Sequence, residues 1–314
     1  MKTRKSYPVN QSPMYQLRSK RRLAEILGIP QSSLIKLSKS DSNYKKFSIT
    51  KNGKPRAVET PKPFLAAIHR KLFGYLRRLE VPDYLHSGVK KRSHITNATA
   101  HIGVNELAKI DIKSFYPSTK RESIYQFFRC SMLCSPDVSK LLTDFCTVDS
   151  HIPTGSQISQ VLAFHCNKEL FDEISQLSKE NDISFTCYVD DLSFSGKKVP
   201  PSFLWEVKKL IVKYGYRYHK EHRYSKSKVK VVTGVAIRGD EVLVKNAHHQ
   251  SIHELQEKLS NGIISDSELK SLVGMLNSAS QLDARYGKLS KVVGKQSISP
   301  PNKANSSDAK KRRG

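Results

Sequence analysis

The chain has 314 residues, 38% of them apolar, and its 54 lysines and arginines against 28 acidic residues give a net charge of +26. This length and apolar content exclude global disorder and leave room for two domains or one multi-lobed enzyme. The charge predicts a polyanionic partner, either nucleic acid or an anionic membrane surface. No run approaches the roughly 18 consecutive apolar residues of a membrane helix, which excludes a spanning segment, and of the two partners we expect nucleic acid and no membrane.

The five cysteines are odd in number and scattered, which predicts free thiols and a cytoplasmic location. Cys130, Cys134, His165 and Cys166 lack the second paired motif of a zinc site, so inert thiols are the better interpretation. Residues 1–46 read as a basic arm followed by helices, with seven lysines and arginines and no acid in the first 24 residues. Residues 295–314, rich in Ser, Pro, Asn and Lys, predict a flexible basic tail.

The first half of the chain alternates short helices and strands. Residues 21–38 predict two helices broken near Gly28-Ile29-Pro30. Residues 47–59 predict a hairpin that turns at Asn52-Gly53. Residues 63–79 have the apolar spacing of a helix. A short strand at 108–115 then precedes a helix through Ile124 and Phe128.

The second half continues this mixture. We expect a helix at 159–178, strands at 183–189 and 192–195, a helix at 203–214, a hairpin of 228–237 with 241–244, and two or three helices over 247–286. This order predicts an α+β fold in which helices cover one face of an antiparallel sheet, a ferredoxin-like arrangement.

The most informative segment is 185–196, where an apolar strand runs into Asp190 and Asp191 and returns as a second strand. A solvated turn is the simple alternative, because Asp is common in turns. Apolar flanks and a third acid, Asp111, at the end of another strand pattern favour a metal site instead. Three gathered carboxylates could hold two divalent cations, and hard oxygen ligands favour Mg²⁺. The residues therefore predict polymerase or nuclease chemistry in a basic groove.

Four motifs in order sharpen this prediction. Tyr188-Val189-Asp190-Asp191 resembles the YxDD box of reverse transcriptases, and residues 111–118 resemble their first catalytic motif. Residues 97–101 match the NAxxH element of bacterial retron reverse transcriptases, and Val232-Thr233-Gly234 matches their VTG element. The resemblance to retron reverse transcriptases covers roughly residues 47–286.

This resemblance implies a right-hand polymerase fold. Its parts would be fingers at 47–107, a ferredoxin-like palm with a fingers insertion at 108–245, and a small helical thumb at 246–294 that binds noncoding RNA. The implied activity is that of an RNA-directed DNA polymerase that binds its cognate noncoding RNA and primes from a guanosine 2′-OH. Its product would be branched multicopy single-stranded DNA. Host RNase H would remove the template, and a separately encoded effector protein would act with the complex in antiphage defence.

The resemblance also assigns the residues of the reaction. Asp111 and Asp190 would ligate both Mg²⁺ ions, with Asp191 supporting the site. Tyr116 would exclude a ribonucleotide 2′-OH. Lys54 and Arg56 would bind the deoxynucleoside triphosphate.

Further positions follow from the same motifs. Gly155 and Gln157 would lie in the nucleotide-contacting loop, and Lys220 would protonate pyrophosphate, with a general RNA-binding face as an equal alternative. Asn97, His101, Thr233 and Gly234 would contact RNA or support the structure. Thr154 and Gln160 depart from the family, which commonly has Gln and Pro there.

Two other functions are open at this point. One is a different bacterial reverse transcriptase, either group II intron-like or defence-type, with another primer. The other is a non-catalytic RNA-binding scaffold, which the complete set of Asp111, Asp190 and Asp191 disfavours because unpaired acids in a cationic groove oppose RNA binding.

Overall fold

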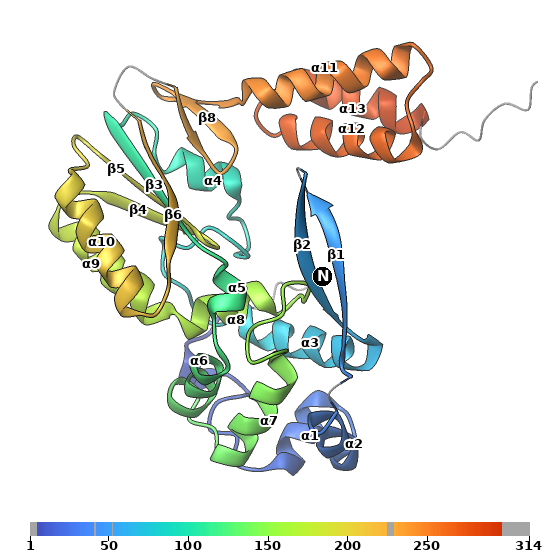
Figure 1. Ribbon diagram of the computed structural model, residues 1–314, viewed down its shortest axis with the longest axis vertical. Helices are drawn as coiled ribbons and strands as arrows, with labels where there is room; N and C mark the ends of the chain where they lie inside the picture. The colour runs from blue at the N-terminus through green and yellow to red at the C-terminus, as the bar shows by residue number, and fades with distance from the viewer. Residues whose placement is uncertain (1–4, 41, 52, 225–228, 297–314) are drawn as a thin grey trace, which may run out of the picture.

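The computed structural model describes residues 5–40, 42–51, 53–224 and 229–296. Of the tail expected at 295–314, the first two residues belong to a helix and the rest lies outside this part. Helices and strands are intermixed along the chain, which confirms the α+β class (Figure 1). The N-terminal elements are a 3₁₀ turn at Val9–Gln11, α1 (Lys20–Leu27), α2 (Gln31–Ser38), β1 (Tyr44–Lys51), β2 (Lys54–Pro61) and α3 (Pro63–Leu76).

Local sequence signals account for these N-terminal elements. Gly28 ends α1 in the left-handed region at φ +57°, where glycine has no steric penalty, so the predicted break between two helices is confirmed. Strands β1 and β2 pair antiparallel from Tyr44 with Pro61 to Lys51 with Lys54, which confirms the hairpin; Asn52 lies outside the described residues.

The middle of the chain builds a four-stranded antiparallel sheet in the order β4-β5-β3-β6. Alternation along the strands gives this sheet two unlike faces. Phe185 of β4 stacks on Phe194 of β5 at 5.3 Å, and Phe194 packs on Phe203 of α10. The middle elements are α4 (His94–Thr99), β3 (Glu106–Ile112), α5 (Phe115–Ser118), α6 (Arg121–Gln126), a π-helical turn (Phe127–Ser131), α7 (Pro136–Cys146), α8 (Ser159–Cys166), α9 (Lys168–Glu180), β4 (Ser184–Tyr188), β5 (Asp191–Gly196), α10 (Pro201–Lys213) and β6 (Tyr218–Tyr224).

The sequence-based prediction was wrong in three places. The helix expected at 159–178 is broken at Asn167, whose side chain donates to the Ala163 carbonyl and accepts from Tyr216. The run 228–237 is not one strand, because it turns at Thr233-Gly234. Strand β6 was missed: it lies at the sheet edge and its side chains are mostly exposed, so its sequence lacks an apolar alternation.

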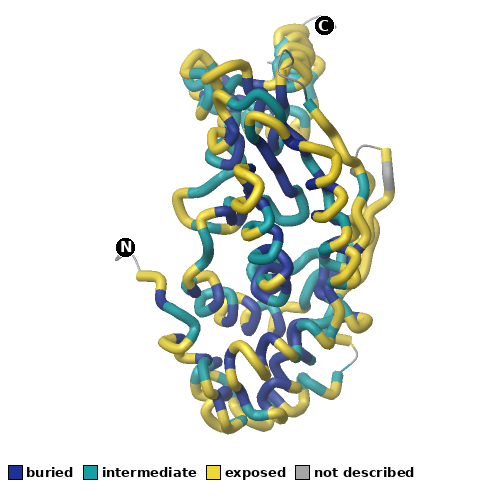
Figure 2. The backbone as a smooth tube through the Cα atoms, turned by 90° about the vertical axis from the view of Figure 1, so that its left-hand side faces the viewer, coloured by how far each residue is buried: buried dark blue, intermediate teal, exposed yellow. Residues whose placement is uncertain are grey.

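The C-terminal meander packs against α4 and β3, and the three helices that follow it lie beyond the sheet (Figure 1). A three-stranded meander leads into three helices with their own apolar core, which includes Ile252, Leu272 and Leu276. Figure 2 shows the buried backbone running from the lower helices into the sheet, whereas the C-terminal helices are largely exposed. The elements are β7 (Lys230–Val232), β8 (Val235–Arg238), β9 (Glu241–Val244), α11 (Asn246–Ser260), α12 (Asp266–Ala279) and α13 (Arg285–Gln296). Throughout the part of the chain that the structure describes, every helix is too short or too polar to cross a membrane.

Candidate active site

The fold brings the three predicted carboxylates to one end of the sheet. Asp111 of β3 lies directly opposite Asp191 of β5 in the strand register. Asp190 occupies the tight turn between β4 and β5, and its carbonyl accepts a hydrogen bond from the Ile112 N–H at 2.9 Å. Asp111 and Asp191, 80 positions apart in the chain, thus become neighbours through strand pairing. We call Asp111, Asp190 and Asp191 the carboxylate cluster.

The turn that presents Asp190 is strained. Val189 has φ +61°, a region that β-branched residues rarely adopt. Its N–H donates to the Ser87 hydroxyl at 3.0 Å, and Ser87 is buried. The segment before Ser87 also bonds to β4, since the Cys187 N–H donates to the Tyr84 carbonyl at 2.7 Å. Strain held by surrounding contacts is typical of functional sites, where it fixes a reactive geometry.

The carboxylates of the carboxylate cluster repel one another. Burial raises the pKa of Asp190 to about 6, and the negative charges of Asp111 and Asp191 raise it further. Burial also raises the pKa of Asp111, while His219 and Lys220 oppose that shift. His219 Nδ1 lies 3.2 Å from one Asp111 oxygen, and Lys220 Nζ lies 3.9 Å from the other. The site is therefore short of positive charge despite the basic surroundings.

The donor chemistry of the cluster fits a divalent metal ion. Carboxylate oxygens are hard ligands that Mg²⁺ prefers, and a dication would relieve the repulsion that raises the pKa of Asp190. Among the described residues, however, no group of three or more His, Cys, Asp or Glu side chains is already arranged around one metal position. The contacts of Asp111 with His219 and Lys220 show that its carboxylate faces side chains of the protein itself. Binding a metal would require these contacts to be exchanged.

Tyr116 lies beside the carboxylate cluster, at the start of α5. Burial raises the pKa of its phenol to about 12, and the negative charge of Asp190 adds to that shift. The preceding Phe115 is buried against Tyr216, with ring centroids 5.6 Å apart. Phe115 is thus buried in the core, while the partly buried Tyr116 packs against the edge of that core near Asp190.

The β1–β2 hairpin is in contact with the loop at residues 152–157. Arg56 on β2 is exposed, as is Gln157, and the side chain of Lys54 lies outside the described part. The Gly155 N–H donates to the Glu59 carbonyl of β2 at 3.1 Å. A Cβ at Gly155 would lie 2.8 Å from Val58 Cγ1, so glycine is needed here because the loop approaches the strand.

The NAxxH and VTG elements meet in the interior. His101 is fully buried, with Nδ1 2.6 Å from the Ser195 hydroxyl of β5 and Nε2 2.7 Å from the Thr186 hydroxyl of β4. Burial lowers the pKa of His101 to about 3, so the ring is neutral. Because its side chain does not reach the surface, His101 cannot touch RNA in this conformation.

The remaining residues of the NAxxH and VTG elements connect α4 to the turn between β7 and β8. Thr233 and Gly234 both have positive φ in the two-residue turn between β7 and β8. The Thr233 hydroxyl donates to the His94 carbonyl of α4 at 2.8 Å, and the amide of the fully buried Asn97 lies 3.4 Å from that hydroxyl. We call Asn97, His101, Thr186, Ser195 and Thr233 the α4 joint. Gly234 remains exposed.

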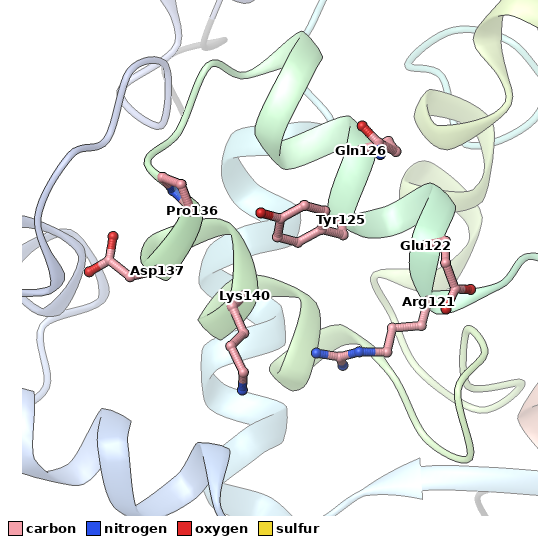
Figure 3. A pocket seen from close by; sticks show the side chains of 7 residues that line it. All are labelled: Arg121, Glu122, Tyr125, Gln126, Pro136, Asp137 and Lys140. Atoms are coloured by element: carbon pink, nitrogen blue, oxygen red, sulfur yellow. The ribbon is translucent and has the colours of Figure 1, made fainter.

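An open pocket lies elsewhere, on α6 and α7 rather than on the strands that carry the aspartates (Figure 3). Arg121 and Lys140 extend toward each other there and both bind Asp144, at 2.5 and 2.9 Å. Asp137 lies 3.7 Å from Lys20. Arg121, Lys140 and Asp137 of this pocket are thus engaged in ion pairs within the protein. Its lining residues are Arg121, Glu122, Tyr125, Gln126, Pro136, Asp137 and Lys140.

Sequence reasoning missed three residues of this region. His219 stands opposite Asp111 in the register, but its only sequence signal is its position beside Lys220. Ser87 supports the strained turn from a loop that carries no recognisable motif. Glu59 is a buried acid in the otherwise exposed basic hairpin, and that isolated charge is the signal that could have identified it.

A mixed α+β fold with three carboxylates at adjoining strand ends is compatible with the polymerase class that the sequence predicted. No protein-family model matches the chain. Curated relatives do: it is 31% identical to the retron Se72 reverse transcriptase of Salmonella heidelberg over 184 residues, 56% of this chain and 48% of that protein. It is 28% identical to the retron Mx162 reverse transcriptase of Myxococcus xanthus over 65% of this chain and 50% of that protein.

A third relative matches over more of its length. The retron Ec83 reverse transcriptase of Escherichia coli is 24% identical over 86% of this chain and 93% of that protein. By contrast, the chain spans about half the length of the Salmonella and Myxococcus relatives. The resemblance to retron reverse transcriptases that the four motifs indicated is thereby confirmed, and these relatives are RNA-directed DNA polymerases.

Proposed function

We propose that this protein is a retron reverse transcriptase, an RNA-directed DNA polymerase that copies part of a cognate noncoding RNA into branched multicopy single-stranded DNA. The observation that carries the proposal is the convergence of Asp111, Asp190 and Asp191 from two motifs in a site short of positive charge. The names of the matching relatives support the same reaction.

The strand order supports assigning the sheet as the palm. The connection β3-helices-β4-β5-α10-β6 is a βαββαβ arrangement, the ferredoxin-like order expected for a palm. We assign 47–107 to the fingers, 108–245 to the palm with its fingers insertion, and 246–294 to the thumb. In this assignment the β1–β2 hairpin belongs to the fingers, and α11 to α13 form the RNA-binding thumb.

The residues of the cluster would hold two Mg²⁺ ions, with Asp111 and Asp190 as ligands and Asp191 in support. Bound metal would activate the attacking hydroxyl and neutralise charge on the phosphates during nucleotidyl transfer. His219 and Lys220, now on Asp111, would then be free to meet the triphosphate or pyrophosphate. Tyr116 would face the sugar and exclude a 2′-OH, while Lys54, Arg56, Gly155 and Gln157 would bind the nucleotide.

The remaining assignments concern partners. The excess of positive charge supports binding of a noncoding RNA and its DNA product through phosphates, with affinity that falls as salt rises. Five free cysteines support a reducing, cytoplasmic environment. We further propose priming from a guanosine 2′-OH, template removal by host RNase H, and antiphage defence with a separately encoded effector.

The decisive experiment analyses nucleic acid that co-purifies with the protein expressed from its native locus with flanking noncoding sequence. Samples treated with RNase, DNase or a debranching enzyme are compared on a denaturing gel with the Asp190→Asn, Asp191→Asn double variant. A short DNA that shifts on debranching and is missing in the variant is expected. Unbranched DNA would indicate another kind of reverse transcriptase, and RNA alone in both samples would indicate a scaffold.

A further inference from the structure

Thr154, one of the two positions where this chain departs from the retron pattern, makes an unexpected set of contacts. Thr154 does not extend freely from its loop, because its hydroxyl donates to the Ala57 carbonyl of β2 at 3.0 Å and accepts from the Glu59 N–H at 3.2 Å. The backbone N–H of Thr154 donates to the Glu59 carboxylate at 3.1 Å. A single threonine therefore makes three hydrogen bonds to one strand of the hairpin.

Glu59 is the centre of these contacts. It is only 8% exposed, which is unusual for a carboxylate, and its two oxygens lie 3.0 and 3.2 Å from His151 Nε2. Its carbonyl also accepts from the Gly155 N–H. A buried acid with this many partners holds two segments of chain together in one geometry. We call Glu59, His151, Thr154 and Gly155 the loop–hairpin clasp.

The other side of the loop is anchored to the helical core. The buried His69 of α3 contacts the Ser156 hydroxyl with one ring nitrogen and the Phe145 carbonyl with the other, at 2.7 Å. The loop is thus hydrogen-bonded to α3 on one side and to β2 on the other. Any displacement of β2 must therefore break bonds of the clasp.

The clasp lies next to the residue that would bind the triphosphate. Ala57 follows Arg56 directly, and Glu59 is three residues further along the same strand. The rest of the hairpin beyond this point is exposed, including Phe47 and Ile49 on β1. Because the described residues between Phe47 and Ala57 are exposed, the position of Arg56 depends on contacts at the base of the hairpin, and the clasp is the set of these contacts on its own strand.

We propose that Thr154 and Glu59 are positioning residues that set the tilt of the β1–β2 hairpin and so place Arg56 for the incoming deoxynucleoside triphosphate. This inference rests on the proposed function. In this chain the threonine side chain binds the fingers hairpin, and its effect on the nucleotide passes through Arg56. The step is a matter of binding and orientation, with no bond made or broken.

The test compares three variants in steady-state incorporation of a deoxynucleoside triphosphate on a primed RNA template. Thr154→Val removes the hydroxyl at constant shape and is expected to raise KM for the nucleotide about tenfold while kcat changes less than about twofold, as follows from losing one to two neutral hydrogen bonds. Thr154→Ser keeps the hydroxyl and is expected to restore KM.

A matched control is available between the same two segments. Lys46 of β1 forms an ion pair with Asp149 at 2.6 Å, and both side chains are more than half exposed. Asp149→Asn breaks this pair but keeps the Asp149 backbone carbonyl, which contacts His151 Nδ1 of the clasp at 3.1 Å. It is expected to leave KM and kcat unchanged, since exposed ion pairs contribute little. A KM for Thr154→Val equal to that of Asp149→Asn would overturn the inference, as would a loss confined to kcat.

Hydrogen exchange separates the clasp from the proposed function. The amides of residues 55–60 are expected to exchange faster in Thr154→Val than in the wild type or in Asp149→Asn. Unchanged exchange would overturn the clasp itself. Faster exchange with an unchanged KM would overturn positioning, and a wild type that incorporates no nucleotide would overturn the proposed function from which the inference starts.

Discussion

The carboxylate cluster and the α4 joint both gather polar side chains from distant parts of the chain, but they do so with opposite electrostatics. In the α4 joint, both ring nitrogens of His101 have hydroxyl partners and the ring is neutral. In the carboxylate cluster, like charges face one another, and the pKa of Asp190 rises to about 6. Buried polar groups that have hydrogen-bond partners stabilise a fold, whereas carboxylates held among like charges are typical of functional sites.

The two regions are linked through the β4–β5 hairpin. His101 contacts Thr186 on one strand and Ser195 on the other, while Asp190 lies at the turn between those strands. The α4 joint therefore supports, from inside the protein, the same hairpin that carries Asp190 and Asp191. Variants that separate stability from activity can test this division.

Asp190→Asn is expected to have the largest effect. DNA synthesis should fall at least about 1,000-fold, because a carboxylate that would bind metal becomes a neutral amide. Stability at pH 7 in metal-free buffer should be retained or should rise by about 1–3 kcal/mol, since the raised pKa of Asp190 means that its ionised form is unfavourable in the folded state above about pH 6. Primer extension and urea unfolding measure the two quantities. Undiminished synthesis would remove the metal assignment.

His101→Ala should show the opposite pattern. Loss of a buried ring and of two hydrogen bonds is expected to lower the free energy of unfolding by about 3–5 kcal/mol. Urea unfolding followed by circular dichroism measures this loss. A stable variant that fails only in RNA binding would show instead that the side chain becomes exposed and contacts RNA.

The pH dependence of stability should have opposite signs in the α4 joint and the carboxylate cluster, because burial lowers the pKa of His101 and raises that of Asp190. Burial lowers the folded-state pKa of His101 to about 3, so the unfolded chain takes up a proton near pH 6.5 and the folded chain does not. This contribution to stability is complete above pH 6.5 and is lost as pH falls toward 3. Between pH 6.5 and 5, His101→Gln should therefore lose about 2 kcal/mol less than the wild type. Parallel curves for the two proteins would show that His101 is not buried as a neutral ring.

Thr233→Val is expected to have the smallest effect. It removes the hydroxyl that donates to the His94 carbonyl, which should cost about 1–2 kcal/mol of stability, and Thr233→Ser should recover most of it. Thermal unfolding of the two variants provides the measurement. Equal losses in both would attribute the effect to the strained backbone at Thr233 rather than to the hydroxyl.

The sequence by itself determined most local elements, because their signals lie within a few residues of one another. The hairpin at 47–59, the break at Gly28 and the paired strands around Asp190 followed from turn residues and alternation. The type of chemistry was also readable, since adjacent aspartates between apolar strands leave few alternatives. Edge strand β6 was not readable, because its charged side chains carry no apolar pattern.

Only the tertiary structure decided which polar residues are buried with hydrogen-bond partners and which lie among like charges. The motifs singled out Asp190 and His101 and gave no role to His219 or Glu59, since composition does not reveal burial or partners. Strand register placed His219 on Asp111 and left Asp190 among like charges, while burial enclosed His101 and Glu59 with partners that satisfy them. Ionisation depends on what surrounds a group in space, and those surroundings come from segments that are far away in the chain.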